Sequence, residues 1–396
     1  MNDCIVSSPL LFYCFIVPLF VLRQAQDRLR EFNPFPSNGA MEQFSSDRTF
    51  TNVTPASLGY RMPAEWEPHE ATWLAWPYNL ETWEEHLEGA EEAFAQFIEI
   101  LTLGEIVHLL VPSAEVEERV QRKLRGRKIP QENLQLHSIE TGDVWFRDFG
   151  PTFLTKGEGG QREVAWTKWK YNALGNKWPD LLMGNEVPDK MPLQKFQRFD
   201  ADIVLEGGSI DVNGSGSLLT TESCLLNPSR NPTLKRSAIE QKLKDFLGVT
   251  NILWLQEGIA GDDTDGHVDD ITRFVGPSTV VTVLEEDPDD ENFATLQENY
   301  RRLQTMKNER GENLRIVTLP MPRPLIVDER RMAASYANFY IANAGVIVPV
   351  YDQPSDAVAL ETLQKLFPKR KIVGIDCREL IFGYGSLHCI SQQHPK

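Results

Sequence analysis

The sequence has few cysteines and few positive charges for its length. Its 396 residues include five cysteines, none of which forms a CxxC pair or shows zinc-ligand spacing. A sparse, odd set of thiols in a chain this long is typical of a reducing compartment. Lysine and arginine together number 40 against 57 aspartate and glutamate residues, which gives a formal net charge of −17. This acidity disfavours nucleic acid and anionic membranes as partners and favours small cations.

The first forty residues differ from the rest of the chain. Residues 5–22 form an apolar run about long enough to span a bilayer, which would suit a signal peptide or an anchor. However, no lysine or arginine precedes the run, Pro9 and Pro18 interrupt it, and no small-x-small cleavage site follows it. We therefore expect residues 1–40 to be a non-native or disordered extension, and the native protein to begin at Met41.

Beyond Met41, apolar runs and amphipathic segments alternate without an evident internal repeat. The runs are rich in valine, isoleucine and leucine, and hairpin signals such as Asn213-Gly214 join several of them. Because no linker or charge block divides the chain, we expect residues 41–396 to form one α/β domain. The aperiodic stretch 155–200 is predicted to be a long loop region near the functional site. A 3.6-residue period predicts helices over 87–103, 113–124, 233–248, 292–309 and 355–367.

Near the C-terminus, the segment GYGSLHCISQQHP places a cysteine close to two glycines. Gly383 and Gly385 flank Tyr384, and Cys389 follows four residues after the second glycine. Glycine lets the backbone approach a substrate closely, and a thiol in such a place can act as a nucleophile. Since most free cysteines are small core residues, this segment alone leaves both interpretations open.

The segment GDDTDGHVDD (261–270) combines five aspartates with one histidine. An EF-hand calcium loop would need acidic residues at two positions that glycine and threonine occupy here, so that interpretation fails. Zinc is disfavoured because His267 and His388 lack paired-ligand spacing. Two interpretations remain: His267 as an acid/base with Asp263 and Asp269 binding a cation, or a solvated acidic turn.

Two further segments place unusual polar residues next to apolar runs. In DIVLEGGSIDVNG, Glu206 could orient a histidine as the third member of a triad, or it could be an exposed hairpin residue. In TGDVWFRDFGPTF, Asp148 and Trp145 suit a guanidinium, through bidentate hydrogen bonds and a cation–π contact. Asp148 could instead pair with Arg147 at the surface.

Together these segments resemble a known family. WFRDFGP, LEGGSIDVNG, LLNPSRNP, GDDTDGHVDD and GSLHCISQQHP resemble, in this order, the agmatine deiminase and bacterial peptidylarginine deiminase family of the guanidine-modifying superfamily. The resemblance runs from about Tyr60 to the C-terminus, and the family more often has threonine where Ser391 stands. It implies a five-bladed α/β propeller of ββαβ modules (pentein type) in a single domain. It also implies a cytoplasmic homodimer or larger homo-oligomer without stable membrane association.

The resemblance also implies a role for each candidate residue. Cys389 is expected to be the nucleophile and His267 the general acid/base, with Glu206 orienting the histidine. Asp148 and Asp269 are expected to grip the guanidinium. The reaction would pass through a covalent thiouronium intermediate and use no metal or organic cofactor. Carboxylates would raise the pKa of the thiol, whereas a bound guanidinium and a protonated histidine would lower it, so the net direction stays open.

The expected substrate is a small cationic guanidine, with Trp145 and Asp263 also in contact with it. Agmatine is favoured over arginine because the four segments offer no basic partner for an α-carboxylate except Arg147. We expect Arg147 to lie on a strand and point away from Asp148. Hydrolysis would give N-carbamoylputrescine and ammonia, a step of putrescine and polyamine biosynthesis.

The main alternative is a peptidylarginine deiminase, which would act on protein substrates. An amidinotransferase, a free-arginine deiminase, a Cys-His protease or amidase and a non-catalytic acidic binding module are less favoured. Cys224 and Cys377 lie in strand-like stretches, and we expect them to lack acid/base neighbours.

We expect a chain that begins at Met41 to fold and to keep full activity, because no part of the resemblance lies in residues 1–40. Size-exclusion chromatography and an ammonia assay on the shorter and the full chain would test this. Aggregation of the shorter chain would contradict it, as would recovery of residues 1–40 from a membrane fraction by mass spectrometry.

Overall fold

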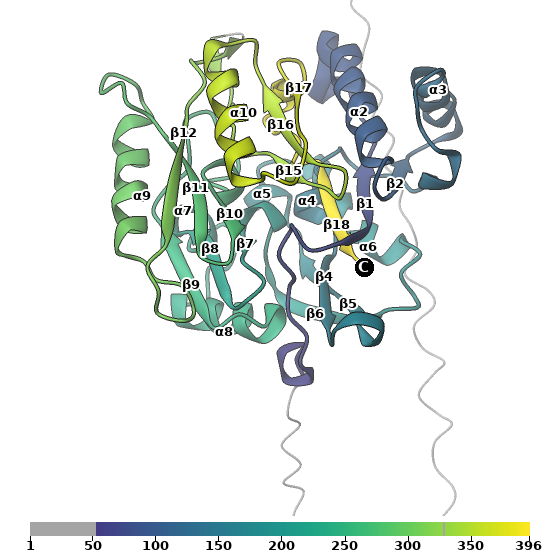
Figure 1. Cartoon of the computed structure of the whole chain (residues 1–396). Coiled ribbons are helices and arrows are strands. Elements are labelled where there is room, and N and C mark those ends of the chain that lie inside the picture. Colours follow the sequence, from purple (N-terminus) through teal and green to yellow (C-terminus); the bar gives the residue numbers. More distant parts are fainter. Residues whose placement is uncertain (1–52, 328) are drawn as a thin grey trace, which may run out of the picture. The chain divides into compact units, whose positions relative to one another are not determined.

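The computed structural model describes residues 53–327 and 329–396, which form a compact unit with a mixed α/β fold (Figure 1). The extension expected at residues 1–40 and the start expected at Met41 lie outside the described residues. Within the described part, none of the helices has the length and apolar character needed to cross a bilayer.

Five sheets share one pattern of strand pairing. In each, two strands pair antiparallel, and the second of them pairs parallel with a strand that follows a helical crossover, as parallel neighbours require. A sixth, two-stranded sheet pairs β13 with β14. The five strand orders are β18-β1-β2-β3, β4-β5-β6, β7-β8-β9, β10-β11-β12 and β15-β16-β17.

The strands have the following bounds: β1 (His69–Ala75), β2 (Ile106–Val111), β3 (Leu134–Ser138), β4 (Thr152–Lys156), β5 (Glu163–Lys170), β6 (Gln197–Val204), β7 (Asp211–Val212), β8 (Ser217–Thr221), β9 (Asn251–Leu255), β10 (Thr272–Gly276), β11 (Thr279–Leu284), β12 (Arg315–Pro320), β13 (Ile326–Val327), β14 (Arg330–Arg331), β15 (Tyr340–Ile341), β16 (Val346–Val350), β17 (Ile372–Asp376) and β18 (Ser391–Pro395).

The helices that cross between strands confirm the five helical predictions. Their ends differ from the predicted ends by a few residues, as is usual for helix termini. The long helices are α2 (Leu87–Leu101), α3 (Ala114–Leu124), α8 (Arg236–Leu247), α9 (Phe293–Thr305) and α10 (Pro354–Leu366). The short ones are α1 (Leu80–Trp83), α4 (Phe146–Phe149), α5 (Ala173–Asn176), α6 (Val187–Lys190) and α7 (Glu222–Leu225).

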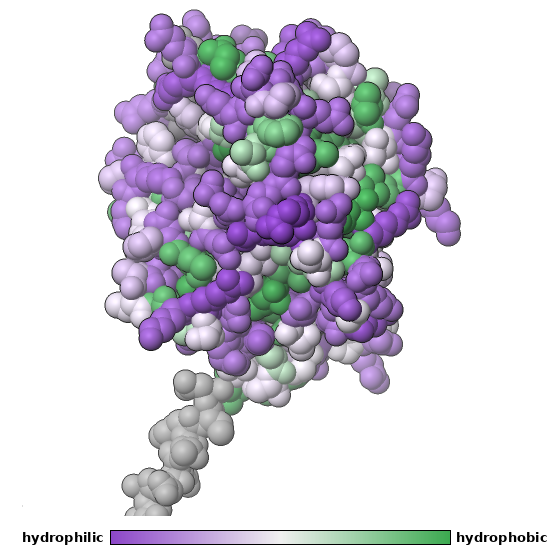
Figure 2. All heavy atoms as spheres, turned by 90° about the vertical axis from the view of Figure 1, so that its left-hand side faces the viewer, coloured by the Kyte–Doolittle hydropathy of each residue, from purple (hydrophilic) through white to green (hydrophobic). Residues whose placement is uncertain are grey.

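Helix α9 shows how these helices cover the sheets. It buries Leu296 and Leu303 and faces β11 of its own sheet. The surface on its side of the molecule is mostly hydrophilic, with apolar side chains only in small scattered patches (Figure 2). The apolar stripe of an amphipathic helix is therefore used inward, as the 3.6-residue period predicts.

The first sheet joins the two ends of the described chain. Strand β18 lies beside β1 and pairs with it antiparallel, with Thr72 opposite Gln393 and Leu74 opposite Ser391 (Figure 1). This pairing anchors the chain immediately after Cys389 to a strand that begins more than three hundred residues earlier in the sequence. The segment that carries the candidate nucleophile is thus held by long-range contacts.

The prediction of a long loop over 155–200 is wrong for much of that stretch. Strand β5 and the start of β6 lie inside it, and β5 buries Trp166 and Trp169. The glycine, proline and tryptophan content of the stretch concealed the strand. Residues 157–162 and 171–196 lack strands, and part of the longer of these two segments does reach the candidate site.

Candidate active site

In the five strand orders given above, the first strands are β4, β7, β10, β15 and β18. The segments that lead into these strands meet beside one cavity of about 290 Å³. Cys389, Asp148, Trp145 and Asp263 line this cavity. Behind them lie side chains with no exposed surface, so the seven residues predicted from sequence come together. In chain order the segments carry Asp148 before β4, Glu206 before β7, His267 and Asp269 before β10, Asn338 before β15 and Cys389 before β18.

This burial excludes the plain alternatives for three of the segments. Glu206, His267 and Asp269 are each 0 % exposed, so neither a solvated acidic turn nor an exposed hairpin residue describes them. Asp148 and Arg147 are also buried, which excludes a surface pair. Buried charges of this kind require partners or a ligand.

The expectation that Arg147 lies on a strand is wrong, because Phe146–Phe149 is a helical turn. The side chain of Arg147 nevertheless points away from the cavity. It donates hydrogen bonds to the backbone oxygen of His388 at 3.2 Å and to Oε1 of Gln393 at 2.7 Å. Asp148 is left free to face the cavity.

Asn338 holds the thiol of Cys389 in place. Its Nδ2 donates to Cys389 Sγ at 3.0 Å and to Asp270 Oδ1 at 2.9 Å. Its Oδ1 accepts from the backbone N–H of His388 at 2.9 Å. The thiol in turn lies 3.7 Å from Asp269 Oδ2. Sequence reasoning missed Asn338, because it lies within the apolar run NFYIANAGVIVPV and resembles part of a strand.

Gly208 marks the point where the candidate catalytic groups converge. A Cβ atom at this glycine would lie 2.5 Å from His267 Nδ1, 3.0 Å from Asp148 Oδ1 and 3.1 Å from Asp269 Oδ2. The backbone N–H of Gly208 also donates to Asp148 Oδ1 at 3.0 Å. The lack of a side chain at Gly208 therefore lets two carboxylates and an imidazole approach the backbone, and one another, closely.

Three polar side chains at this place have atoms that lack hydrogen-bond partners among the described residues. These atoms are both ring nitrogens of His267, Oε2 of Glu206 and Oδ1 of Asp269. The nearest acid to the ring is Asp148, with Oδ1 3.6 Å from Nδ1. The other oxygen of Glu206 accepts from Nε of Arg230 at 3.0 Å. Orphaned polar atoms in a dry site are typical of a binding pocket whose ligand completes the contacts.

The expectation for Cys224 is wrong. It lies in helix α7, and its thiol is within 4.8 Å of the side-chain ligand atoms of both Glu206 and His267. The tertiary fold thus gives Cys224 the acid/base neighbours that its sequence context does not reveal. Cys377, by contrast, lies outside the cavity lining.

Burial and neighbouring charges settle the protonation of the site. Burial raises the pKa of the Cys389 thiol well above its ordinary value, with Asp269, Asp270 and Asp148 adding to the effect. Burial lowers the pKa of His267, but Asp148, Cys224 and Asp269 outweigh it and raise the pKa well above its ordinary value. At neutral pH the free site therefore holds a neutral thiol and an imidazolium. The sequence had left this direction open.

Asp148 and Asp269, which converge at Gly208, differ in their pKa values. Burial, together with Asp269 and Glu206, raises the pKa of Asp148 to about 7 against the opposing effect of His267. Burial would also raise the pKa of Asp269, but His388, His267 and Arg273 outweigh it and lower the pKa. Asp269 is therefore the ionised member of the pair at neutral pH.

Aromatic groups shape the outer cavity. A Cβ atom at Gly385 would lie 2.4 Å from the ring of Trp145 and 3.1 Å from Cβ of Cys389, so glycine there lets the indole lie beside the thiol. Trp178, from the strand-free segment, donates from Nε1 to Asp263 Oδ2 at 2.8 Å. Burial and Asp262 raise the pKa of Asp263 to about 6.

Among the described residues that line the cavity, one is basic, and the four sequence segments did not predict it. Arg330 lies on β14 and donates a hydrogen bond to the hydroxyl group of Tyr384. Acidic residues outnumber it among the described lining residues: Glu81, Glu84, Asp143, Asp148, Asp180 and Asp263. The field in the cavity is therefore suited to a cation.

Two sets of side chains bring three ligand-type atoms within 4.8 Å of one another in the described part of the chain. In each set a protein cation already pairs with a carboxylate: Arg230 with Glu206, and His388 with Asp269. The donor chemistry therefore suits an organic cation better than a metal ion. The two sets are Glu206, Cys224 and His267, and Asp269, Asp270 and Cys389.

Comparisons with known proteins agree with this geometry. The model of the Porphyromonas-type peptidyl-arginine deiminase family matches residues 61–395. An agmatine deiminase from Pseudomonas aeruginosa is 37% identical, over 86% of this chain and 97% of its own.

Solved structures are also similar. An agmatine deiminase of Enterococcus faecalis superposes with a TM-score of 0.81 at 34% identity, covering 87% of this chain and 98% of its own. A cysteine-to-serine variant of the C. jejuni agmatine deiminase with substrate bound superposes with a TM-score of 0.76 at 33% identity, covering 85% of this chain and 96% of its own.

We expect iodoacetamide to alkylate Cys389 slowly at about pH 7 and faster as the pH rises above about 9, because only the thiolate reacts. Peptide mass spectrometry would follow the rate at each cysteine. Asp269→Asn should lower the thiol pKa because it removes a charge. Asp200→Asn is the matched control and should not change it, because Asp200 is exposed and pairs with Arg198 away from the cavity. A fast, pH-independent reaction near neutrality would contradict the neutral thiol.

Proposed function

The chain belongs to the Porphyromonas-type peptidyl-arginine deiminase family, and we propose that it hydrolyses agmatine to N-carbamoylputrescine and ammonia. The single observation that carries this is the convergence of Asp148, Asp269 and His267 at Gly208, beside the cavity that Asp148 and Cys389 line. Two carboxylates can bind the planar, bidentate edges of a guanidinium. Cys389 lies at the same place, with its sulfur 3.7 Å from Asp269 Oδ2.

In the proposed mechanism, substrate binding activates the thiol. A guanidinium between Asp148 and Asp269 brings positive charge next to Cys389, which lowers the pKa of the thiol, and the thiol loses its proton to solvent in the cavity that it lines. The same two carboxylates fix the plane of the substrate so that its central carbon faces the sulfur. The nucleophile is therefore ionised mainly when a cation is present.

In the covalent steps, His267 acts first as a general acid and then as a general base. The Cys389 sulfur forms a bond to the central carbon, and His267 gives its proton to the departing nitrogen, which leaves as ammonia. The product of this half-reaction is a thiouronium. The now neutral His267 then takes a proton from water, and the oxygen bonds to the same carbon. The carbon–sulfur bond breaks, which frees the thiolate and the ureido product.

Glu206 is proposed to support the charge of His267 rather than to hold the ring through a hydrogen bond. Its Oε1 is engaged by Arg230, whereas Oε2 faces the cluster of Cys224 and His267 without a partner. Cys224 is proposed to limit the movement of the ring. These contacts lie on the side of His267 away from the substrate.

The outer cavity supports agmatine as the substrate. Trp145 is placed to pack against the guanidinium and the alkyl chain, and Asp263 can pair with the distal ammonium. The acidic lining attracts a dication and repels a free α-carboxylate. We propose that the product enters putrescine and polyamine biosynthesis.

Arg330 favours a second candidate function, the hydrolysis of peptidyl-arginine. Its guanidinium lies at the cavity lining and is exposed, so it can pair with a carboxylate or a peptide carbonyl. This would suit arginine at the end of a peptide or within a protein. We rank this peptidylarginine reaction below agmatine hydrolysis because Arg330 already contacts Tyr384 and carboxylates outnumber it.

Three further features are part of the proposal. The five ββαβ sheets are proposed to close into a five-bladed propeller around the cavity, with residues 41–396 as the catalytic domain. The described cysteines Cys224, Cys377 and Cys389 are free, which supports a cytoplasmic location. A homodimer or larger homo-oligomer is proposed from the resemblance alone.

We expect kcat/KM for agmatine to exceed that for arginine by at least about a hundredfold, because arginine loses a desolvated charge pair and brings a carboxylate into an acidic cavity. Ammonia release from agmatine, arginine, an internal peptidyl-arginine and a simple amide would be measured with the same enzyme. Cys389→Ala should be inactive, whereas Cys377→Ser is the matched thiol control and should stay active. Faster turnover of the peptide would promote the second candidate, and turnover only of the amide would exclude both.

We expect Gly208→Ala to lower kcat/KM by about a hundredfold or more, because its methyl group would displace His267 and the two aspartates proposed to bind the guanidinium. Alanine is not strained at this backbone position, because Gly208 lies outside the left-handed region. Gly160→Ala is the matched control, because nothing lies within 4 Å of the added atom. Thermal melts and agmatine kinetics would compare the two variants, and normal turnover by Gly208→Ala would place the substrate elsewhere.

A further inference from the structure

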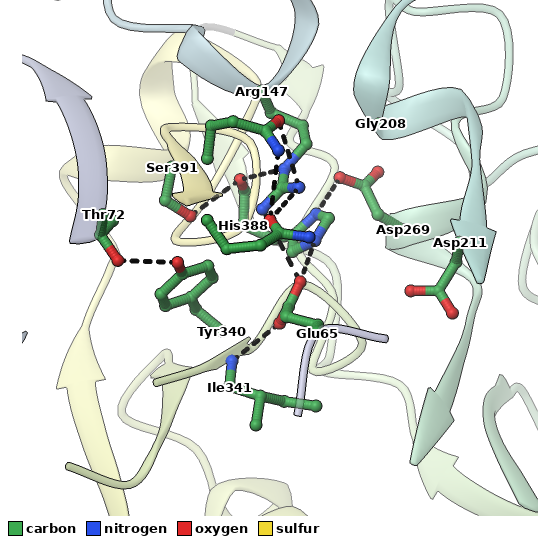
Figure 3. Close-up of polar contacts among 12 residues, drawn as sticks. Glu65, Thr72, Arg147, Gly208, Asp211, Asp269, Tyr340, Ile341, His388 and Ser391 are labelled. Atoms are coloured by element: carbon green, nitrogen blue, oxygen red, sulfur yellow. Dashed lines mark hydrogen bonds and ion pairs between the residues drawn. The ribbon is translucent and has the colours of Figure 1, made fainter. Parts of the chain in front are cut away.

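His388 precedes the candidate nucleophile and bridges two buried carboxylates. Its Nδ1 lies 2.6 Å from Asp269 Oδ2, and its Nε2 lies 2.8 Å from Glu65 Oε2 (Figure 3). The ring is 2 % exposed, so water does not compete for these contacts. Neither the sequence motifs nor the proposed mechanism gives this side chain a role.

The donor count identifies the form of the ring. An ionised carboxylate only accepts hydrogen bonds, and a neutral imidazole has a single N–H. Two short contacts to two ionised carboxylates therefore require both ring nitrogens to donate. His388 satisfies both partners only as an imidazolium, unless one of the carboxylates carries the proton instead.

Glu65 is held as an anion on the far side of the ring. Arg273 Nη2 donates to Glu65 Oε2 at 2.9 Å, and the backbone N–H of Ile341 donates to Oε1 at 2.8 Å. Burial would raise the pKa of Glu65, but Arg273, His388 and Arg147 outweigh it and lower the pKa strongly. The proton of the bridge therefore resides on His388 and not on Glu65.

We propose that His388 is a positioning residue for the guanidine reaction: its ring, anchored on Glu65, keeps Asp269 ionised and oriented beside Asp148 and His267 for the substrate. This inference rests on the proposed function, because it assigns the guanidinium to Asp269. Asp269 faces His388, His267 and Arg273 as cations, and Asp148, Asp270 and the thiol of Cys389 as the other titratable groups.

The difference between the two aspartates shows what His388 contributes. Asp148 is equally buried and lies near the same histidine, but its hydrogen bond comes from the backbone of Gly208 instead of from an imidazolium. Burial raises its pKa to about 7. Without His388, Asp269 would lack its main cationic partner and would bind a proton in a similar range.

His388 also connects this carboxylate to the nucleophile. The backbone N–H of His388 donates to Asn338 Oδ1, its carbonyl accepts from Arg147 Nε, and the carbonyl of Cys389 accepts from the backbone N–H of Arg147 at 3.1 Å. The backbone on both sides of the bond between residues 388 and 389 is thus fixed. The ring that orients Asp269 and the sulfur that attacks the substrate therefore move as one unit.

The test is His388→Gln, which keeps a polar donor but cannot carry charge or bridge both carboxylates. We expect KM for agmatine at about pH 7 to rise at least about tenfold, with a smaller loss in kcat, because cation binding is weakened before the covalent step. The acidic limb of kcat/KM against pH should move up by about one unit or more, because Asp269 then binds its proton more tightly. A variant with normal folding and an unshifted limb would overturn the proposal.

His394→Gln is the matched control. His394 is also buried and stacks on Phe153 at 4.3 Å between ring centroids, and its hydrogen-bond contact is with the indole of Trp73 rather than with a carboxylate. Its loss should lower the melting temperature without moving the pH profile. An equal shift of the profile in this variant would mean that packing, not the charge of His388, controls the site.

Glu65→Gln is the second arm, and it leaves the His388 ring in place while removing the anchoring charge. The acidic limb should move in the same direction by a smaller amount, and the double variant should move no further than His388→Gln. If the pH shifts of the two single variants add up in the double variant, Glu65 does not act on Asp269 through His388, and the proposal is wrong.

Two measurements separate this inference from the proposed function. In His388→Gln the apparent pKa for alkylation of Cys389 by iodoacetamide should fall, because Asp269 loses charge beside the thiol; this readout needs no agmatine. Nitrogen-15 spectra of wild-type protein labelled at histidine should show both ring nitrogens of His388 as hydrogen-bond donors, as the contacts with Asp269 and Glu65 require. An unchanged thiol together with a single N–H on the His388 ring would overturn the role of His388, whereas absent agmatine turnover alone would overturn only the proposed function.

Discussion

The site depends on a shortage of buried positive charge. A cavity for an organic cation needs carboxylates, but burial makes each ionised carboxylate costly, and so do its like-charged neighbours. The protein pairs some of them with fixed cations: Arg230 with Glu206, His388 with Asp269, and Arg273 with both Glu65 and Asp211. Asp148 has only the more distant His267 ring as a cationic neighbour, at 3.6 Å, and burial raises its pKa to about 7. A bound guanidinium supplies the positive charge that the protein withholds.

This incomplete charge balance links binding to reactivity. A thiol surrounded by carboxylates stays neutral until a cation enters, so the reactive thiolate forms mainly when a substrate is present. The same field that suppresses the free nucleophile therefore also selects the substrate by charge. In the proposed mechanism, His267 can then act as an acid first, because the free site already holds it as an imidazolium.

The recurring ββαβ order explains how five distant segments reach one cavity. Each sheet presents the residues just before the first strand of its strand order, and Asp148, Glu206, His267, Asn338 and Cys389 come from these equivalent positions. Asn338 belongs to this set although its own segment looks like an ordinary apolar run. The pairing of β18 with β1 fixes the last of the five segments, which carries His388 and Cys389. The positions are rigid because regular sheets, rather than free loops, set them.

The sequence by itself determined the helices and the α/β class, because these depend on local periodicity. It also singled out the seven candidate site residues, but each segment alone left a plain alternative open, and the resemblance to a family assigned the roles. The tertiary structure decided what depends on contacts across the chain: that residues 163–170 form a strand, that Cys224 lies beside His267, and that Arg330 lines the cavity. It also decided the protonation of Cys389 and the bridge through His388. Burial and the identity of neighbouring charges set a pKa, and both arise only when segments that are hundreds of residues apart are packed together.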